Sequence, residues 1–212
     1  MDPQLEARVA EAAAVLRAGG IVVYPTETFY GLGALASDDA ALARLAAAKL
    51  RPEGKPLPLV AADREQVDRV ASLEGAAARL AGRLWPGPLT LVLPARPGLS
   101  EAVTAGSGTV GVRIPGSEVA RALARMAGGA LVSTSANLSG GPPPDRVEAL
   151  DAALRAQVDH VLDAGPTPGG LPSTVVAVAG EALRVVRPGA VSIEQVTAAL
   201  GGPTGALHRP GP

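Results

Sequence analysis

Residues 19–50, GGIVVYPTETFYGLGALASDDAALARLAAAKL, decide the fold class. Gly19-Gly20 ends a helix, and Ile21–Tyr24 is a short apolar run that stops at Pro25, as a buried strand does. After a polar loop, Ser37 or Asp38 can cap an alanine-rich helix that ends near Ala48. A strand between two helices predicts an α/β protein.

The same alternation continues on both sides of this stretch. We expect a single α/β domain over residues 1–202, built on a mixed sheet with flanking helices, and a disordered tail over 203–212. The closely spaced C-terminal strands predict antiparallel pairing. The expected helices cover 5–16, 64–70, 75–84, 117–126, 145–156 and 192–201, and the expected strands cover 57–62, 89–93, 109–114, 130–134, 160–162, 174–178 and 183–186.

Composition excludes several classes of protein. The 212 residues contain no cysteine, which excludes a disulfide framework, a thiolate nucleophile and a zinc–thiolate cluster. The N-terminus lacks the pattern of a signal peptide, and no apolar run approaches the roughly 20 residues of a membrane span. We therefore expect a cytoplasmic protein that does not bind membranes. A net charge of -1 also predicts weak or no direct binding of nucleic acid.

Residues 31–36, GLGALA, fit the dinucleotide-binding pattern G-x-G-x-x-G/A. That pattern needs its first glycine directly after the strand, but PTETFY separates the two here. The acidic residue expected about 20 positions further on is also misplaced, since Asp63 lies well beyond that. A nicotinamide enzyme is therefore a weak alternative. His160 and His208, the two histidines, belong to no recognisable triad or metal pair.

Lysine is rare here, since the chain has 2 Lys among its 19 basic residues. Both lysines, Lys49 and Lys55, lie in KLRPEGKPL with Arg51 between them. A compact ammonium and a planar guanidinium together suit a site that holds phosphate oxygens. A solvated basic loop is the plainer interpretation.

Three further segments place polar residues at strand ends. In TVGVRIP, alternation puts Arg113 and Gly111 on the face opposite Val110 and Val112. STSANLSGG contains the single Asn, Asn137, and STVV has an arginine pair a hairpin later. Hydroxyls, cations and flexible backbone suit positioning and electrostatic catalysis on phosphate, and no nucleophile–base pair emerges. An ordinary ion pair and a plain Ser/Asn turn remain alternatives.

Taken together, these motifs resemble the YrdC-like family, the threonylcarbamoyl-AMP synthases. The resemblance runs from about Leu5 to Leu200 and rests on PTETFYGLG, KLRPEGKPL, LWPGPLT, TVGVRIP, STSANLSG, STVV and RPG in this order. It implies a twisted sheet with a basic concave cleft. It also implies formation of threonylcarbamoyl-AMP and pyrophosphate from L-threonine, bicarbonate and ATP with Mg²⁺, for a downstream transferase complex that modifies tRNA.

The resemblance also implies a role for each residue that matches a motif. Thr28, Arg113, Ser133 and Ser173 are expected to bind L-threonine. Lys49, Arg51 and Lys55 are expected to act catalytically on the phosphates. The residues expected to hold ATP or the adenylate are Arg51, Lys55, Thr109, Ser135, Asn137 and Arg187.

Two departures from the family pattern concern residues expected to affect substrate binding. Val60 stands where many relatives carry a histidine, and Pro142-Pro143-Pro144 replaces polar residues after the SAN turn. Two other functions remain open as alternatives: a relative that handles carbamoyl phosphate, and a non-catalytic RNA-binding module. Four aromatic residues, three of them in one loop, offer few stacking platforms for RNA bases.

Overall fold

The computed structural model describes residues 1–50, 54–201 and 207–208. Its helices are α1 Pro3–Arg17, α2 Asp39–Ala48, α3 Arg64–Val70, α4 Gly75–Leu84, α5 Glu101–Thr104, α6 Glu118–Ala127, α7 Ala152–Arg155 and α8 Ile193–Ala198, with a 3₁₀ turn η1 at Val147–Ala149. Its strands are β1 Val22–Pro25, β2 Tyr30–Gly33, β3 Leu59–Val60, β4 Leu89–Pro94, β5 Thr109–Arg113, β6 Leu131–Val132, β7 Thr134–Ser135, β8 His160–Val161, β9 Thr174–Ala179, β10 Ala182–Arg187 and β11 Leu207–His208.

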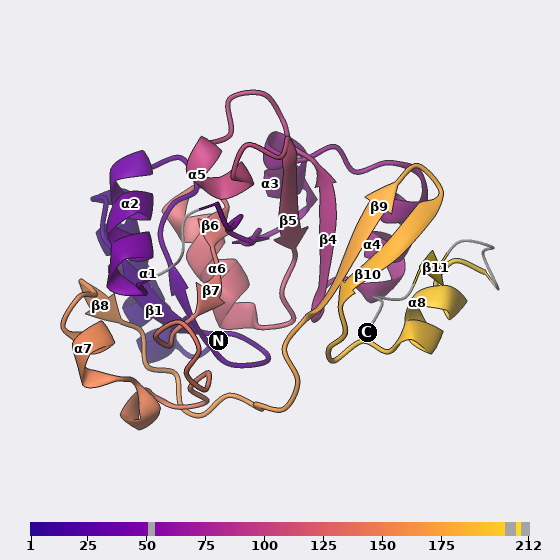
Figure 1. The fold of residues 1–212 in the computed structure, drawn as a ribbon. Coiled ribbons are helices and arrows are strands. Elements are labelled where there is room, and N and C mark those ends of the chain that lie inside the picture. Colours follow the sequence, from indigo (N-terminus) through magenta and orange to yellow (C-terminus); the bar gives the residue numbers. More distant parts are fainter. Residues whose placement is uncertain (51–53, 202–206, 209–212) are drawn as a thin grey trace.

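The described strands form two sheets. The smaller sheet has the order β7-β2-β1-β8, and the larger has the order β11-β10-β9-β4-β5-β3-β6. Both are mixed, since β4 runs antiparallel to β5 but parallel to β9, and β1 runs antiparallel to β2 but parallel to β8. Figure 1 shows the smaller sheet with α1 and α2 at one end and the β9–β10 hairpin with α8 at the other. The predicted mixed α/β fold is confirmed, with two sheets in place of one.

Short polar side chains start the helices at the predicted positions. The Asp38 carboxylate accepts a hydrogen bond from the Ala41 amide at 2.9 Å, and Asp63 caps α3 in the same way. Ser117 caps α6, and Ser192 forms a reciprocal capping box with Gln195 at α8. These caps fix where each helix leaves its sheet.

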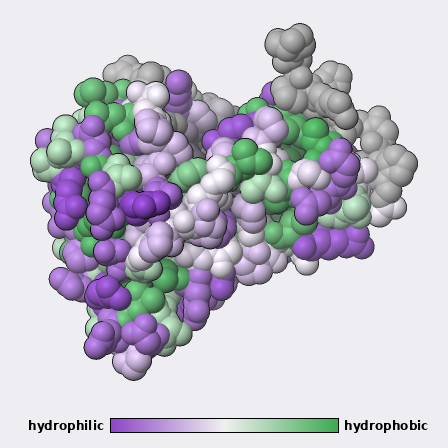
Figure 2. Space-filling model, turned by 90° about the horizontal axis from the view of Figure 1, so that it is seen from below, coloured by the Kyte–Doolittle hydropathy of each residue, from purple (hydrophilic) through white to green (hydrophobic). Residues whose placement is uncertain are grey.

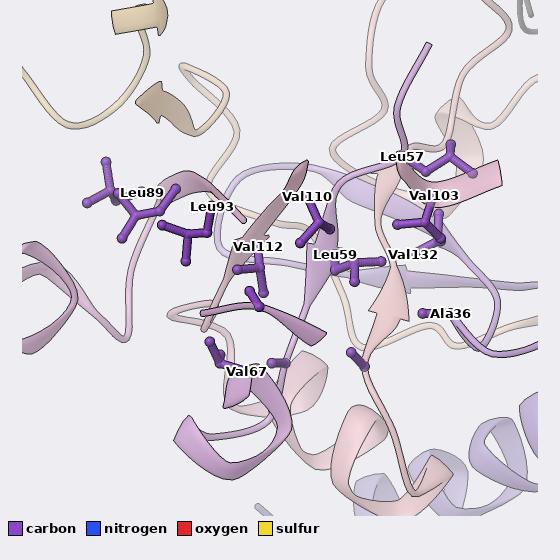
Figure 3. Close-up of a cluster of buried hydrophobic side chains, with 14 of the residues drawn as sticks. Ala36, Leu57, Leu59, Val67, Leu89, Leu93, Val103, Val110, Val112 and Val132 are labelled. Atoms are coloured by element: carbon purple, nitrogen blue, oxygen red, sulfur yellow. The ribbon is translucent and has the colours of Figure 1, made fainter. Parts of the chain in front are cut away.

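The apolar residues separate into two buried clusters. The larger includes alternate residues of β4 and β5, such as Leu91 and Val112, which are almost fully buried, and it extends to β1 and β2 of the smaller sheet. Figure 3 shows part of this cluster between the strands and the helix that carries Val67. The smaller cluster packs α1 and α6 together against β1. The opposite faces of β4 and β5 are thereby left for polar residues.

Several predicted elements differ from the observed ones. The strand expected over 130–134 is divided between β6 and β7, which belong to different sheets. Tyr30–Gly33, expected in a loop, forms β2, and the strand expected over 57–62 is restricted to Leu59–Val60. The helix expected over 145–156 is wrong: η1 and α7 occupy part of it, and the Asp145 carbonyl instead accepts hydrogen bonds from Thr167. Within the tail 203–212, Leu207–His208 is described as a strand paired with β10, and the other tail residues lie outside the described ranges.

The surface carries no broad apolar face in the view from below. Hydrophilic and hydrophobic residues form small interspersed groups there (Figure 2). Within residues 1–50, 54–201 and 207–208, no helix combines the length and apolarity that a bilayer crossing requires.

Candidate active site

A cavity of about 560 Å³ opens on the polar face of the large sheet. The large sheet contributes Thr90 from β4, Gly111 and Arg113 from β5, and Val175 from β9. The smaller sheet closes the other side with the loop 26–29 and the start of β2. The cavity is therefore built where the two sheets face each other.

β5 shows why the cavity has this wall. Val110 and Val112 are buried in the core, whereas Thr109, Gly111 and Arg113 line the cavity, as the alternation predicts. Gly111 has no side chain to project into the cavity, and a Cβ there would be in ordinary contact with the methyl group of Thr90 at 3.4 Å. The Arg113 side chain can therefore lie across the space.

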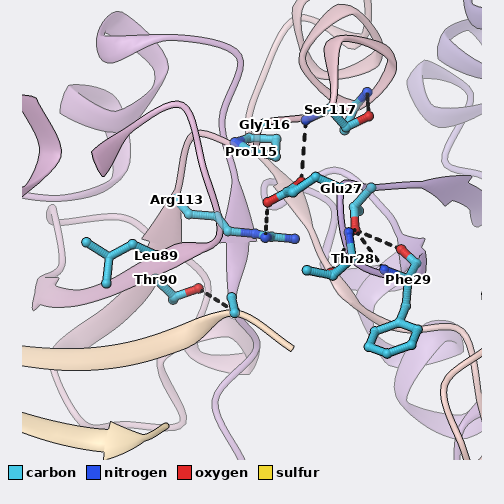
Figure 4. A network of polar contacts seen from close by, with 12 residues as sticks. Glu27, Thr28, Phe29, Leu89, Thr90, Arg113, Pro115, Gly116 and Ser117 are labelled. Atoms are coloured by element: carbon cyan, nitrogen blue, oxygen red, sulfur yellow. Dashed lines mark hydrogen bonds and ion pairs between the residues drawn. The ribbon is translucent and has the colours of Figure 1, made fainter. Parts of the chain in front are cut away.

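Arg113 forms a buried ion pair with Glu27. The guanidinium Nη1 donates to the Glu27 carboxylate, and the two side chains are 8% and 16% exposed. The other Glu27 oxygen accepts a hydrogen bond from the Ser117 amide at 3.4 Å. Figure 4 shows the Arg113 side chain reaching from the large sheet toward Glu27, with Ser117 beyond the carboxylate. Burial distinguishes this pair from an ordinary surface ion pair.

A second group of polar contacts connects β4, β9 and β10. Arg187 Nη2 donates to the Ser173 carbonyl at 2.8 Å and to the Ser173 hydroxyl at 3.1 Å. That hydroxyl lies 3.0 Å from the Thr90 hydroxyl. Partial burial of the guanidinium, followed by repulsion from Arg113, lowers the pKa of Arg187. Arginine remains charged despite such a shift, so two cations act on this cavity.

Ser133 lies between the cavity and a buried phenol. Burial raises the pKa of Tyr24 to about 12, although a hydrogen bond with Ser133 opposes the shift. Room for this ring depends on Gly33, where a Cβ would come within 2.7 Å of Tyr24 Cε1. The phenol therefore stays protonated at neutral pH, and it contacts Ser133 on the side that faces away from the cavity.

In the turn after Ser133, the Asn137 side chain forms its hydrogen bonds within the turn itself. Ser135 lines the cavity, whereas Asn137 Nδ2 donates to the carbonyls of Leu138 and Gly141, both at 2.7 Å. Asn137 Oδ1 is buried without a hydrogen-bond partner among the described residues. Lys49, 3% exposed, directs its ammonium to the Ser135 and Asn137 carbonyls.

The cavity brings together most of the residues expected from the sequence. Lys49, Lys55 and Asn137 are not among its lining residues, and Arg51 lies outside the described residues. The expected residues that line it are Thr28, Thr109, Arg113, Ser133, Ser135, Ser173 and Arg187.

The sequence assigns no role to several polar residues of the site, and Glu27 and Thr90 are the clearest examples. Glu27 stands in the quoted PTETFYGLG motif but was given no role, and its partner Arg113 is distant in sequence. Thr90 ends the quoted LWPGPLT motif, but a single threonine in an apolar strand indicates no role until the fold places it against Ser173.

The geometry also settles two other expectations. Gly31 and Gly33 lie inside β2, with no helix N-terminus directly after them, which rules out the dinucleotide-binding interpretation of 31–36. Val60 is buried in the cluster around α1 and α6, and its neighbour Leu59 lines the cavity. Val60, where the chain departs from the family pattern, is therefore not one of the residues that line the cavity.

A family model described as telomere recombination, Sua5/YciO/YrdC, matches residues 14–189. The chain belongs to the Sua5/YciO/YrdC family. It is 42% identical to the threonylcarbamoyl-AMP synthase of Bacillus subtilis over 94% of this chain and 57% of that protein. The corresponding protein of Pyrococcus abyssi is 36% identical over 92% of this chain and 58% of its own length. The chain thus spans a little over half the length of these two relatives.

Solved structures of the Sua5/YciO/YrdC family agree with the fold. P. abyssi Sua5 complexed with L-threonine matches with a TM-score of 0.87 and 35% identity, covering 96% of this chain and 59% of that one. Escherichia coli YciO matches with a TM-score of 0.82 and 27% identity, covering 90% of this chain and 93% of that one.

Proposed function

We propose that this chain forms L-threonylcarbamoyl-AMP and pyrophosphate from L-threonine, bicarbonate and ATP. The observation that carries the proposal is the single cavity wall that gathers Arg113, Ser133, Ser173 and Arg187 from four separate segments. Relatives named threonylcarbamoyl-AMP synthase support it, as does the Sua5 structure with L-threonine. The proposal places the reaction in the cytoplasm, upstream of a tRNA-modifying transferase complex.

At the amino-acid end, Arg113 is the group proposed to hold the threonine carboxylate. A guanidinium has five donors in a planar fork, and Glu27 engages Nη1. Arg113 lines the cavity, so the rest of its fork is available to a substrate carboxylate. Thr28, Ser133 and Ser173 supply hydroxyls around it.

At the phosphate end, cations and hydroxyls are proposed to hold ATP. Arg187, Thr109 and Ser135 line the cavity, and Lys55 is an exposed neighbour of Pro56, which also lines it. Arg51 stays in this proposed group, whereas Lys49 and Asn137 lie outside the lining and are not placed in contact with the phosphates. Within the described residues, no three histidine or acidic side chains form a metal cluster, so we propose that Mg²⁺ arrives bound to ATP.

The chemistry requires positioning more than a covalent enzyme intermediate. The threonine amine combines with bicarbonate to give a carbamate and water. A carbamate oxygen then attacks the α-phosphorus, the bond to the β-phosphate oxygen breaks, and pyrophosphate leaves with that electron pair. Fixed cations stabilise the negative charge that develops on the phosphates.

Pyrophosphate release tests the proposal. We expect release from ATP to require both L-threonine and bicarbonate. Release that is independent of either substrate would overturn the assignment, as would dependence on carbamoyl phosphate. Tight, salt-sensitive RNA binding without turnover would instead favour an RNA-binding module, since neutralised phosphates make such binding depend on salt.

A further inference from the structure

Lys49 closes the turn 135–141 from outside the cavity. It is the residue directly after α2, and its ammonium donates to the Asn137 carbonyl at 2.6 Å and to the Ser135 carbonyl. Both acceptors belong to the backbone of the turn. An ammonium with carbonyl partners in a 3% exposed site forms charge-assisted hydrogen bonds, which are stronger than neutral ones.

The backbone of Lys49 holds the same turn from its other end. The Lys49 carbonyl accepts hydrogen bonds from the Ser139 amide at 3.2 Å and the Ser139 hydroxyl at 3.0 Å. One residue therefore contacts the turn at Ser135, Asn137 and Ser139. The Asn137 amide group completes the closure from inside by donating to two further carbonyls of the turn.

This turn forms part of the cavity wall. Ser135 lines the cavity and pairs with Gly31 in the β2–β7 ladder. The Ala136 amide donates to the Tyr30 carbonyl at 2.9 Å, which fixes the turn to the smaller sheet. A change in the turn must therefore move the wall that Ser135 presents to a ligand.

We propose that Lys49 is a positioning residue that acts through the turn 135–141 and not on the phosphates directly. The inference rests on the proposed function for its effect on turnover, but its structural part does not. It also accounts for a lysine in an arginine-rich chain. A compact ammonium can meet converging carbonyls in a buried space, whereas the larger planar fork of arginine suits carboxylates and phosphates.

Hydrogen exchange of the nucleotide-free protein tests the structural part. We expect Lys49→Met to accelerate amide exchange within residues 135–141 by about tenfold or more, because the charged anchor of the turn is lost. The amides of β4 and β5 should exchange as in the parent protein. Lys55→Met is the matched control, because Lys55 belongs to the same motif but is exposed. In that variant the amides of residues 135–141 should stay as protected as in the parent protein. Unchanged exchange in Lys49→Met would overturn the proposal whether or not the protein makes the adenylate.

Steady-state kinetics test the functional part. Distortion of the wall predicts that Lys49→Met raises the KM for ATP by about tenfold, as for the loss of one charge-assisted hydrogen bond. We expect Lys49→Arg to recover little activity, because it keeps the charge but not the compact ammonium. Parental turnover in Lys49→Arg with a deprotected turn would overturn the proposal, as would a fall in kcat alone with normal exchange. Ser139→Ala, which removes one neutral bond to the Lys49 carbonyl, provides a milder second variant if Lys49→Met fails to fold.

Discussion

At the residue scale, the Glu27–Arg113 pair gives the sharpest stability prediction. Glu27→Ala leaves a guanidinium that is almost fully buried without its anionic partner. Breaking such a pair typically costs about 3 kcal/mol or more, because the remaining charge stays desolvated. Urea unfolding should show this loss in the free energy of unfolding.

The matched control is an exposed pair of the same chemistry. Glu65 pairs with Arg69 on α3, and the two side chains are 75% and 59% exposed. We expect Glu65→Ala to change the free energy of unfolding by less than about 0.5 kcal/mol. Equal losses in the two variants would contradict the buried character of the Glu27 pair.

The two tyrosines give a prediction about alkaline pH. Burial raises the pKa of Tyr24 and Tyr30 to about 12 in the folded protein, against about 10 in an unfolded chain. Between pH 10 and 12 the unfolded state loses these protons first, so stability falls as pH rises through this window. Tyrosinate absorbance should therefore rise near pH 12 in the native protein and near pH 10 in urea. A native midpoint near 10 would contradict the burial of both phenols.

At the element scale, the junction between β10 and α8 gives a prediction about close backbone packing. A Cβ at Gly189 would lie 2.2 Å from the Pro172 carbonyl oxygen and 2.6 Å from the Ser173 carbonyl carbon. These are backbone atoms, so Gly189→Ala must displace the segment that presents Ser173. We expect a loss of about 1–3 kcal/mol in unfolding free energy and a raised KM for L-threonine.

Gly82→Ala is the control for this substitution. Gly82 lies within α4, and a Cβ there would meet nothing within 4 Å. Alanine favours a helix over glycine, so we expect stabilisation of about 0.5–1 kcal/mol with unchanged kinetics. Thermal unfolding of both variants measures the contrast, and destabilisation by Gly82→Ala would contradict the open space found at Gly82.

The elements that the sequence predicted well have strong local signals. Helices with an Asp or Ser cap and apolar periodicity, such as α3 and α6, begin where expected. The sequence does not predict β2, because YGLG has two glycines in four residues and its pairing with β1 and β7 makes it a strand. The false helix over 145–156 has a plausible period, but tertiary contacts of Asp145 with Thr167 override it.

At the scale of the whole molecule, ligands should stabilise the fold by linking its two sheets. A ligand present at 100 times its Kd adds about 2.7 kcal/mol to the stability of the state that binds it. We expect L-threonine and ATP each to raise the Tm. Arg113→Gln should abolish the shift with L-threonine while it keeps the shift with ATP. Loss of both shifts in that variant would contradict separate amino-acid and phosphate ends.

The candidate site can be predicted from the sequence only in part, because motifs are local whereas the cavity is assembled by long-range contacts. Motifs identified Arg113, Ser133 and Ser173 individually, because each stands at a strand end among polar neighbours. The motifs do not show that the Lys49 ammonium donates to backbone carbonyls of the turn 135–141. That contact depends on α2 ending beside β7. Side-chain type therefore indicated the chemistry, and long-range pairing decided which groups face the cavity.

The parallel pairing of β4 with β9 has a consequence for the synthesis of the chain. Leu89 pairs with Thr174, and the lining of the cavity extends from Thr26 to Arg187. A nascent chain can form α1 and the β1–β2 hairpin early, but the cavity wall must wait until β10 has left the ribosome. The lining is thus completed late, so a chain truncated before β9 should lack the part of the cavity wall that Val175 and Arg187 supply.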